Sequence, residues 1–542
     1  MNGLMMDFPL TITSIIQHAE SVHGDSEIVS VTRDNPRHRY TYRDAFRRTR
    51  QLANALATWS LASGSSIATL AWNDYRHFEV YYASACSGFV CHTINPRLSP
   101  EQIVYIVNHA EDRLLFVDPD FMPLVEAIAD KCPGVERWIV MTSEAHMPET
   151  KLQNVLCYER LVHSHSDDFD WPQLDENQAC ALCYTSGTTG NPKGVLYSHR
   201  STMLHAYATL MPDALGLAHH DAVLPIVPMF HVNAWGTPYG APMVGAKIVF
   251  PGNRMGDGET LAALINEEKV TRSAGVPTVW LNLLNYLKQS GKTVDSLKQI
   301  IVGGAACPLS IMEAFDAHGV ETRVGWGMTE MSPLGSANAS YHERDRHTPE
   351  SFARLRQKAG KPIFGVEMKI VDDDGKRLPW DGEAYGSLMV RGPWICSGYF
   401  KLGKTDSHTD DGWFETGDVA TIDPQGTMAI TDRTKDVIKS GGEWISSIEI
   451  ENVATDHPKV AEAAVIGRYH PKWSERPLLI VVKAPDGADL TSEEMLAWFD
   501  GKIAKWWTPD AVEFVDELPH GATGKIQKVD LRQQFEDYAF EA

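Results

Sequence analysis

Helix-like and strand-like segments alternate from residue 10 to about residue 145. Apolar residues recur at helical spacing over 42–59 and 100–109, whereas 67–72 and 114–117 are short apolar runs typical of buried strands. Helices that alternate with strands cover the faces of parallel sheets, so few architectures are open to such a chain. The N-terminal part is therefore predicted to contain parallel sheets covered by helices.

The rest of the chain shows two further patterns. Residues 365–425 contain short β-like runs separated by turns rich in Asp, Gly and Pro, which predicts a small antiparallel barrel or sheet. From residue 436 a compact β/α pattern follows. We place a boundary at 432–436, so that 1–432 form an N-terminal part and 433–542 a C-terminal α+β part large enough to fold alone. The polar stretch 341–358 is predicted to be a mobile surface excursion.

The composition indicates a folded protein that does not bind polyanions. Of the 542 residues, 49 are Lys or Arg and 71 are Asp or Glu, and the net charge of −22 disfavours nucleic acid and acidic membranes. The basic run 37–50 is accordingly predicted to be the solvated face of a helix. No window has the ~18 uninterrupted apolar residues of a membrane helix, and the chain start lacks the basic segment of a secretory signal. These features predict a cytoplasmic protein without stable membrane insertion.

The eight cysteines are too sparse over this length for a disulfide framework. Cys180 and Cys183 do form a CxxC motif. They lie, however, in the apolar run 179–184, which is predicted to be a buried strand in which residues three apart point to opposite faces. A redox or zinc pair is therefore not predicted, and no second CxxC completes a metal site.

The sharpest local motif is YTSGTTGNPKG, residues 184–194, directly after that strand. Its glycines let backbone N–H groups approach an anion closely, its hydroxyl groups add donors, and Lys193 adds a positive charge. The motif thus predicts a phosphate-binding loop. It is not a Walker A loop, because the spacing to Lys193 and the residue after it do not fit.

Five further motifs follow this loop in order, and together the six resemble the signatures of the adenylate-forming superfamily, which includes acyl-CoA synthetases, luciferases and the adenylation domains of peptide synthetases. The five are GGAACP at 303–308, GWGMTE at 325–330, GWFETGD at 412–418, DRTKDVIKSGGEWIS at 432–446 and PHGATGKIQK at 519–528. This resemblance implies a large N-terminal domain of two doubly wound α/β sheets plus a small β-barrel, followed by a mobile C-terminal lid domain.

The resemblance also implies the residues that bind ATP and Mg²⁺. Thr329 would contact the α-phosphate, Glu330 would hold Mg²⁺, and Asp418 and Arg433 would bind the ribose hydroxyls. A carboxylate oxygen such as that of Glu330 suits a hard cation, and a carboxylate such as Asp418 can accept paired hydrogen bonds from the ribose diol. The remaining ATP-binding residues form the phosphate loop, the flat wall for adenine and the strand beside it: Thr185, Ser186, Gly187, Thr188, Thr189, Gly190, Lys193, Gly304, Ala305, Ala306, Trp326, Gly327 and Met328.

The implied reaction has two steps. A carboxylate attacks the α-phosphate of ATP to give an acyl-adenylate and pyrophosphate, and the thiol of CoA then displaces AMP. Lys525 resembles the catalytic lysine that brings the two anions together in the first step, with Lys528, Lys435 and Lys439 as competing candidates. Lys435 matches the hinge about which the small domain rotates between the steps. The predicted CoA-binding segment is Lys439, Ser440, Gly441, Gly442 and Glu443.

The segment PMFHVNAWG, 228–236, bears on the acid. His231 and Val232 stand where amino-acid-activating relatives carry an aspartate, so a substrate without an α-amine is favoured. Trp235 resembles the gate tryptophan of fatty acyl-CoA synthetases, and Gly327 also lines the predicted acid site. Over its whole length the chain is similar to medium-chain fatty acid and 3-methylmercaptopropionate CoA ligases, which implies a short or medium acyl chain.

Other functions remain open at this stage. An aryl acid such as a cinnamate is the alternative substrate, and a luciferase-like oxygenase would need an unusual one. A non-catalytic relative that only binds nucleotide is disfavoured by the presence of Thr329, Glu330 and Lys525. A serine hydrolase is disfavoured because the sequence has no G-x-S-x-G elbow. A homodimer is predicted only as the common default.

Overall fold

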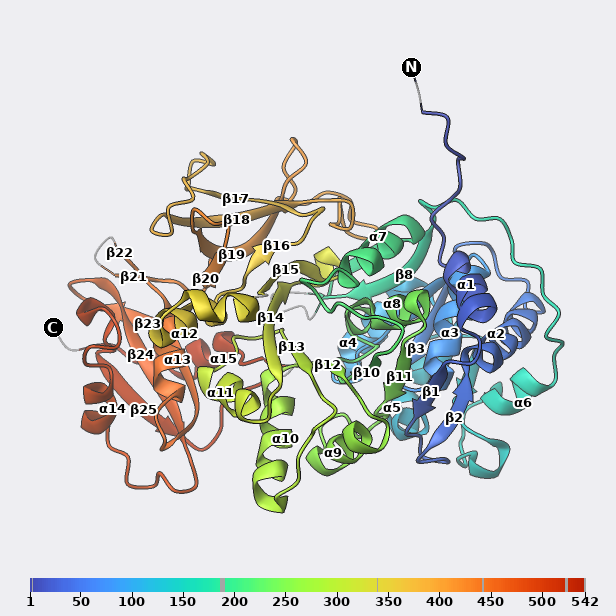
Figure 1. The fold of residues 1–542 in the computed structure, drawn as a ribbon, viewed down its shortest axis with the longest axis horizontal. Helices are drawn as coiled ribbons and strands as arrows, with labels where there is room; N and C mark the ends of the chain where they lie inside the picture. Colours follow the sequence, from blue (N-terminus) through green and yellow to red (C-terminus); the bar gives the residue numbers. More distant parts are fainter. Residues whose placement is uncertain (2, 186–190, 339, 441–442, 522–524, 541–542) are drawn as a thin grey trace.

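The computed structural model describes residues 1, 3–185, 191–338, 340–440, 443–521 and 525–540. Their strands form sheets of seven, nine, four and five strands. In Figure 1 the two large sheets and their helices make up the centre and right of the molecule, and the last hundred residues lie together on the left. The predicted multidomain α/β and α+β fold is confirmed.

One large sheet is formed by residues 66–198. It contains β3 (Ser66–Leu70), β4 (Val90–Thr93), β5 (Leu114–Val117), β6 (Arg137–Val140), β7 (Val155–Cys157), β8 (Ala179–Tyr184) and β9 (Gly194–Ser198). The strand order is β7-β6-β5-β3-β4-β8-β9, and all neighbours are parallel except β8 and β9, which form a hairpin. The loop of this hairpin is the glycine-rich motif, and the predicted strand with both CxxC cysteines is β8.

The nine-stranded sheet combines two distant parts of the chain. Its strands are β1 (Glu27–Ser30), β2 (His38–Thr41), β10 (Ala222–Pro225), β11 (Lys247–Phe250), β12 (Arg272–Gly275), β13 (Gln299–Val302), β14 (Glu321–Gly327), β15 (Leu334–Asn338) and β16 (Lys361–Pro362). The order is β16-β15-β14-β13-β12-β10-β11-β1-β2. Strand β1 lies parallel to β11, with Ile28 opposite Ile248, so an N-terminal strand completes a sheet built from residues much further along.

Helices cover and join the two sheets. They are α1 (Thr13–His23), α2 (Tyr42–Ala57), α3 (Tyr75–Cys86), α4 (Pro100–Ala110), α5 (Met122–Ile128), α6 (Tyr158–His163), α7 (His199–Thr209), α8 (Thr237–Val244), α9 (Gly258–Glu267), α10 (Pro277–Ser290) and α11 (Leu309–Ala317). Helix α3 contacts β4 and β8 of one sheet and β1 of the other, and all of its residues are buried. The two sheets therefore share one core.

Residues 367–433 form a four-stranded antiparallel sheet at the top of Figure 1. Its strands are β17 (Glu367–Val371), β18 (Tyr385–Arg391), β19 (Phe414–Ile422) and β20 (Met428–Arg433). Among the described residues the pairings run in the single order β17-β18-β19-β20. Of the two predicted forms, barrel and sheet, the structure therefore has the sheet.

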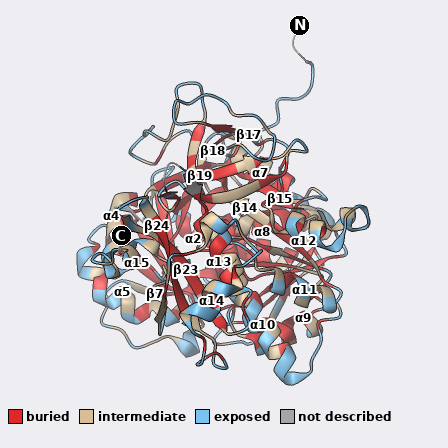
Figure 2. Cartoon of the chain, turned by 90° about the vertical axis from the view of Figure 1, so that its left-hand side faces the viewer, coloured by how far each residue is buried: buried red, intermediate tan, exposed pale blue. Residues whose placement is uncertain are grey.

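The C-terminal part has its own sheet and core. Its elements are β21 (Ile438–Ser440), β22 (Glu443–Ile445), α13 (Ser447–Thr455), β23 (Val460–His470), β24 (Ser474–Lys483), α14 (Ser492–Trp498), β25 (Ala511–Val515) and α15 (Lys528–Gln534). Figure 2 shows β23 and β24 as buried strands, with exposed residues on the neighbouring α14. Residues 434–437 connect β20 to β21, at the position of the predicted hinge, which stays a prediction.

The polar stretch 341–358 is partly helical. It contains α12 (Pro349–Gln357), in which Phe352 and Arg356 are buried. The guanidinium of Arg356 binds Asp316 on α11 at 3.0 Å. One aromatic residue and one ion pair thus pack a helix whose composition is otherwise polar against the fold, while the predicted mobility of the stretch stays a prediction.

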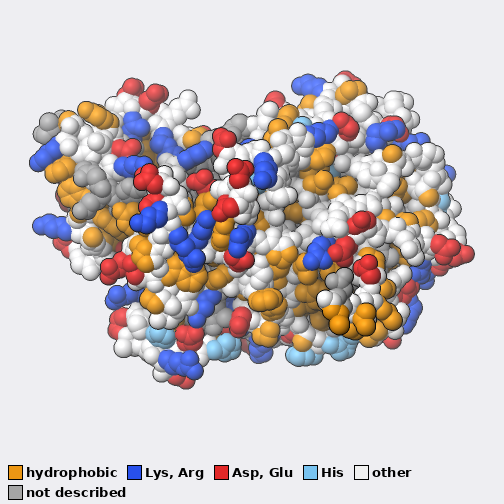
Figure 3. Space-filling model, turned by 90° about the horizontal axis from the view of Figure 1, so that it is seen from above, with side chains coloured by type: hydrophobic (Ala, Val, Ile, Leu, Met, Phe, Trp, Pro, Cys, Tyr) orange, Lys and Arg blue, Asp and Glu red, His pale blue; other side chains and the backbone are white. Residues whose placement is uncertain are grey.

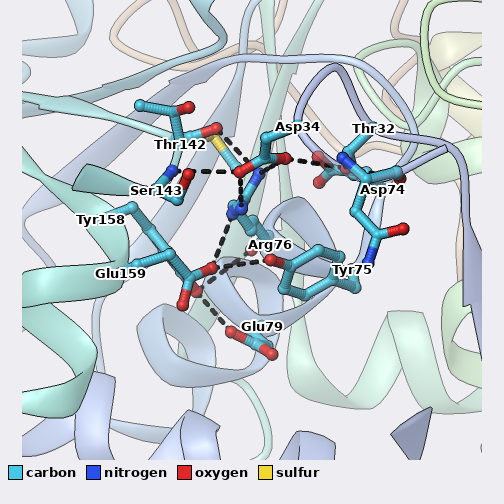
Figure 4. Close-up of polar contacts among 12 residues, drawn as sticks. Thr32, Asp34, Asp74, Tyr75, Arg76, Glu79, Thr142, Ser143, Tyr158 and Glu159 are labelled. Carbon is cyan, nitrogen blue, oxygen red and sulfur yellow. Dashed lines mark hydrogen bonds and ion pairs between the residues drawn. The ribbon is translucent and has the colours of Figure 1, made fainter. Parts of the chain in front are cut away.

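A buried network of charged side chains lies in the N-terminal part (Figure 4). Arg76 on α3 lies between Asp34 and Glu159, at 2.7 and 2.8 Å. Arg48 on α2 binds the same Glu159 at 3.0 Å and Glu79 at 2.8 Å. The prediction that the basic run 37–50 is a solvated helix face is therefore wrong for Arg48. Removing one partner would leave a buried charge uncompensated, which typically costs about 3–5 kcal/mol.

The first residues of the chain carry large apolar side chains that the fold leaves exposed: Met1, Leu4, Met5, Met6 and Phe8. In Figure 1 this segment rises away from the sheets, and Figure 3, which looks down on the same side, shows hydrophobic side chains grouped there. The segment joins the fold at Leu10, whose N–H donates to Glu176 at 2.9 Å. Among the described helices, none is both long and apolar enough to cross a membrane.

Candidate active site

The glycine-rich loop is closed at its two ends by hydrogen bonds. Thr185 N–H donates to the Lys193 carbonyl at 3.0 Å, and Lys193 N–H donates to the Thr185 hydroxyl at 3.1 Å. These bonds extend the β8–β9 ladder, in which Tyr184 lies opposite Gly194. The structure thus places the ends of the predicted phosphate loop; its middle lies outside the described residues, namely Ser186, Gly187, Thr188, Thr189 and Gly190.

Thr329 and Glu330 lie on a short turn just after β14, and each is only 7% exposed. Tyr399 donates its hydroxyl to Glu330 Oε1 at 2.7 Å. Burial raises the pKa of this carboxyl group, against the hydrogen bond from Tyr399 and the positive charges of Arg433 and Lys193. Glu330 is therefore a buried carboxyl group held in one orientation close to the end of the glycine-rich loop.

Asp418, Arg433 and Trp326 form one hydrogen-bonded group. Asp418 lies on β19, opposite Arg433 on β20, and is 5% exposed. Arg433 Nε lies 2.8 Å from Asp418 Oδ1, and Trp326 Nε1 donates to Oδ2 at 2.9 Å. A carboxylate oxygen accepts more than one hydrogen bond, so Asp418 keeps lone pairs for a ligand hydroxyl. The residues predicted to bind ribose are thus brought together.

Three small residues follow β13 and are exposed: Gly304, Ala305 and Ala306. The preceding Gly303 packs against Trp235, since a Cβ atom there would lie 2.8 Å from the indole ring. At the end of β14, a Cβ atom on Gly327 would lie 1.8 Å from the Pro333 carbonyl oxygen, so only glycine fits; Met328 follows, partly exposed. These segments lie at the carboxyl ends of parallel strands, where open α/β sheets bind ligands.

Lys525 lies beside these groups. Its charge interacts with Asp418, Glu330 and Arg433, and also with His231. Solvent reaches the side chain, yet protein surrounds it closely. Desolvation, followed by the repulsion of Arg433, lowers the pKa of Lys525 to about 8 against the attraction of the two carboxylates. The C-terminal part thus contributes a cation to the same site as β14 and β19.

The competing lysines have other surroundings. Lys528 Nζ binds Glu451 Oε1 at 2.7 Å and also the Ser447 hydroxyl, all within the C-terminal part. Lys435 is exposed in the connection between β20 and β21, and Lys439 lies on β21. Lys525 is therefore the candidate catalytic lysine that the geometry favours.

The predicted CoA-binding segment is the β21–β22 hairpin of the C-terminal sheet. Lys439 N–H donates to Glu475 at 2.9 Å, and the buried Ser440 hydroxyl lies 3.3 Å from Arg476 Nη1. Glu443 begins β22. Gly441 and Gly442 lie outside the described residues. The role of this segment in binding CoA stays a prediction.

His231 and Trp235, the residues predicted to bind the acid, lie at either end of one short turn. Burial, followed by the charges of Lys525 and Arg97, lowers the pKa of His231 to about 4, so its ring is neutral at pH 7. Trp235 is partly buried and lies against Gly303. The two residues are joined by the turn Val232–Gly236, whose backbone is left-handed.

Sequence reasoning missed several residues of the site. Tyr399 holds Glu330, and its ring lies 4.9 Å from the Lys193 ammonium group. Tyr197 donates its hydroxyl to the Thr329 carbonyl at 2.6 Å. These hydrogen bonds join residues 69 and 132 positions apart, and no local pattern reveals such pairs.

The lowered pKa of Lys525 predicts a pH dependence. Lysine is charged below its pKa, so acyl-adenylate formation should fall as the pH rises through about 8, well below the ordinary lysine value of about 10.5. The measurement is the pH profile of kcat/KM for pyrophosphate release. Lys525→Arg should move the alkaline limb to higher pH, because arginine stays protonated. A limb that is unmoved in this variant would contradict the assignment.

Comparisons with known proteins agree with this geometry. Residues 16–400 match the family described as AMP-binding enzyme, and 449–525 match the AMP-binding enzyme C-terminal domain. The chain is 52% identical over 538 residues to 3-methylmercaptopropionyl-CoA ligase of Ruegeria lacuscaerulensis, with 99% of each chain covered. It is 49% identical over 538 residues to medium-chain-fatty-acid–CoA ligase of Ectopseudomonas oleovorans, covering 99% of this chain and 98% of the relative.

A solved structure gives the same result. The anthranilate CoA ligase AuaEII, in complex with anthranoyl-AMP, matches with a TM-score of 0.86 at 26% identity, and 98% of each chain is covered. The chain therefore belongs to the AMP-binding enzyme family, among its acyl-CoA ligases.

Proposed function

We propose that this protein joins a short- or medium-chain carboxylic acid to CoA, using ATP and releasing AMP and pyrophosphate through an acyl-adenylate. The observation that carries the proposal is that Lys525, from the C-terminal part, lies near Glu330 and Asp418, while Glu330 in turn lies near Lys193 of the glycine-rich loop. A cation that approaches a phosphate site from another domain suits a reaction in which two anions must come together. Cytoplasmic location and a homodimer stay predictions from the sequence.

In the first step, Lys525 would stand between the carboxylate of the acid and the α-phosphate and offset the repulsion between them. Thr185 and Lys193, at the ends of the loop, would hold the outer phosphates. Asp418 and Arg433 would fix the ribose, so that the α-phosphate faces the acid in line for attack. His231 is neutral and so adds no charge next to the incoming acid.

The residues present fit a magnesium ion. Mg²⁺ is commonly bound through one or two carboxylates plus substrate phosphates, and it favours hard oxygen ligands. Glu330 offers such a carboxylate, oriented by Tyr399. In the part of the chain that the structure describes, no three His, Cys, Asp or Glu residues gather as a metal site, so Glu330 would hold the ion together with phosphate oxygens of ATP. When bound, the ion would neutralise negative charge on the phosphates.

In the second step, the C-terminal part would rotate about Lys435, withdraw Lys525 and bring the β21–β22 hairpin toward the site for CoA. The support for this step is the short connection 434–437 between two separately packed sheets. The 3-methylmercaptopropionyl-CoA ligase that shares half of the sequence suggests a small, unbranched acid for this chain as well.

An acid panel tests the proposal. Butyrate, octanoate, 3-methylmercaptopropionate and cinnamate are each incubated with ATP, Mg²⁺ and CoA, and the nucleotide products are separated by chromatography. AMP and pyrophosphate with an aliphatic acid are the expected products. ADP with any acid would overturn the mechanism, a preference for cinnamate would select the aryl alternative, and absence of turnover with every acid would favour a non-catalytic relative.

Trp235 should influence the preference for chain length. Trp235→Ala enlarges the apolar space next to Gly303, so the ratio of kcat/KM between octanoate and butyrate should rise. One methylene in an apolar pocket is typically worth about 1–3 kcal/mol, so the change should be graded over the series of acids. An unchanged profile in a folded variant would assign Trp235 to the core instead.

A further inference from the structure

The turn Val232–Gly236 has a backbone conformation that is rare for residues with a Cβ atom. Four consecutive non-glycine residues have positive φ: Val232 at 47°, Asn233 at 50°, Ala234 at 49° and Trp235 at 55°. In L-residues this left-handed conformation brings Cβ too close to the following carbonyl oxygen, so it occurs as single residues and seldom as a run. Such backbone persists only where the surroundings fix it, and it clusters at functional sites.

Asn233 supplies a contact that fixes this turn. Asparagine is among the non-glycine residues that best tolerate the left-handed region. Asn233 is 3% exposed, and the Tyr81 hydroxyl lies 3.2 Å from its Oδ1, sharing its single hydrogen between this oxygen and the Met229 carbonyl. The thiol of Cys183, on β8 just before the glycine-rich loop, lies 3.5 Å from the same oxygen.

The same tyrosine also holds the start of the segment. The Tyr81 hydroxyl donates to the Met229 carbonyl, and Met229 N–H donates to Asn73 Oδ1 at 2.6 Å. Tyr81 lies on the fully buried helix α3 and is itself 0% exposed. The turn is therefore tied through Asn233 to the shared core of the two large sheets.

The left-handed conformation of the turn determines where the Trp235 side chain lies. Trp235 is the last non-glycine residue of the turn, and its ring packs on Gly303, directly before the exposed Gly304. Gly236 then packs on the ring of His205, where a Cβ atom would lie 2.8 Å away. The Trp235 indole thus packs on the backbone of Gly303, and the next residue, Gly236, packs tightly on His205. A small rotation of the turn would therefore move the indole away from Gly303.

We infer that Asn233 is a positioning residue: by holding Val232–Gly236 in the left-handed conformation, it fixes the Trp235 indole against Gly303 and so sets the length of acid that the site accepts. This inference rests on the proposed function, because it takes Trp235 to line the acid site. Asn233 touches neither the acid nor the nucleotide in this account and acts through Trp235.

Two substitutions of Asn233 separate the loss of its side-chain hydrogen bond from the loss of its tolerance for positive φ. Asn233→Gly removes the hydrogen bond but keeps the tolerance for positive φ, whereas Asn233→Ala removes both. Each should change the octanoate-to-butyrate ratio of kcat/KM by about 3- to 10-fold, the range expected for the loss of one buried hydrogen bond, with Asn233→Ala the larger. Ala234→Gly is the matched control, since it eases the backbone next door without removing a bond, and it should leave the ratio unchanged.

A double-variant cycle shows whether Asn233 acts through the indole. In a Trp235→Ala background, Asn233→Gly should no longer alter the ratio. A full-sized shift in that background, or no shift from Asn233→Gly in the otherwise unchanged folded enzyme, would overturn the inference. If the Asn233 variants fail to fold, as judged by their melting temperatures, Tyr81→Phe repeats the test: it removes the hydroxyl contacts to both Asn233 Oδ1 and the Met229 carbonyl, and its shift should likewise disappear in the Trp235→Ala background. Loss of the proposed function is distinguishable, because the unchanged enzyme would then ligate no acid at all.

Discussion

Lys525→Ala should nearly abolish formation of the acyl-adenylate while leaving the transfer to CoA intact. Lys525 is the cation that the structure places near both Glu330 and Asp418 from the C-terminal part. Losing a preorganised charge at a developing anionic centre commonly costs about 100-fold or more in rate. Single-turnover release of pyrophosphate from ATP and octanoate measures this first half-reaction.

The second half-reaction supplies the contrast. The same variant, given synthetic octanoyl-adenylate and CoA, should still form the thioester, because the proposed rotation withdraws the lysine from the site in that step. Lys505→Ala, an exposed lysine of the same part of the chain, is the matched control and should affect neither step. Equal loss of both steps in folded Lys525→Ala would rule out a role confined to adenylation.

Lys435→Pro should have the opposite effect and impair mainly the second step. Lys435 lies in the tight connection where the Arg433 carbonyl accepts from the N–H groups of Asp436 and Val437. Proline fixes φ near −65° and restricts the residue before it, so the connection loses the freedom that a rotation requires. Pyrophosphate release in a single turnover should persist, and the adenylate should accumulate when CoA is added.

Lys435→Ala is the control for that experiment, because it removes the side chain and leaves the backbone free. It should resemble the unchanged enzyme in both half-reactions. If Lys435→Ala blocks thioester formation as strongly as Lys435→Pro, the side chain and not the backbone is required, and the hinge assignment would have to be replaced. If Lys435→Pro loses both steps while folded, rotation about this connection is not what separates them.

Local patterns in the sequence indicated several elements around the candidate site. The strand β8 follows from its apolar run, and the loop that Thr185 and Lys193 close follows from its motif. The resemblance assigned Asp418 and Arg433 to one site, and the structure places them opposite each other on neighbouring strands. The orienting hydrogen bond from Tyr399 to Glu330 could not be predicted, because it depends on how two distant segments pack.

Burial was the other source of error. Arg48 stands in a basic run that reads as a solvated helix face, yet its carboxylate partners come from positions 79 and 159. The left-handed turn at Val232–Gly236 likewise has little signature in its residue types, apart from Asn233 and Gly236, since Val, Ala and Trp avoid that conformation. Both features are imposed by tertiary contacts that a single sequence does not display.

The pairing of β1 with β11 affects how the chain can be made. Ile28 meets Ile248, so the ribosome must synthesise about 220 further residues before the N-terminal strand finds its neighbour. Contacts so far apart in sequence delay folding, since a long loop must close before they form. Until then, β1 and β2 form at most a two-stranded ribbon, which is marginally stable alone. Strand β1 therefore lacks its parallel neighbour until β11 has been synthesised, and truncation before residue 250 should yield a chain that does not reach its native state.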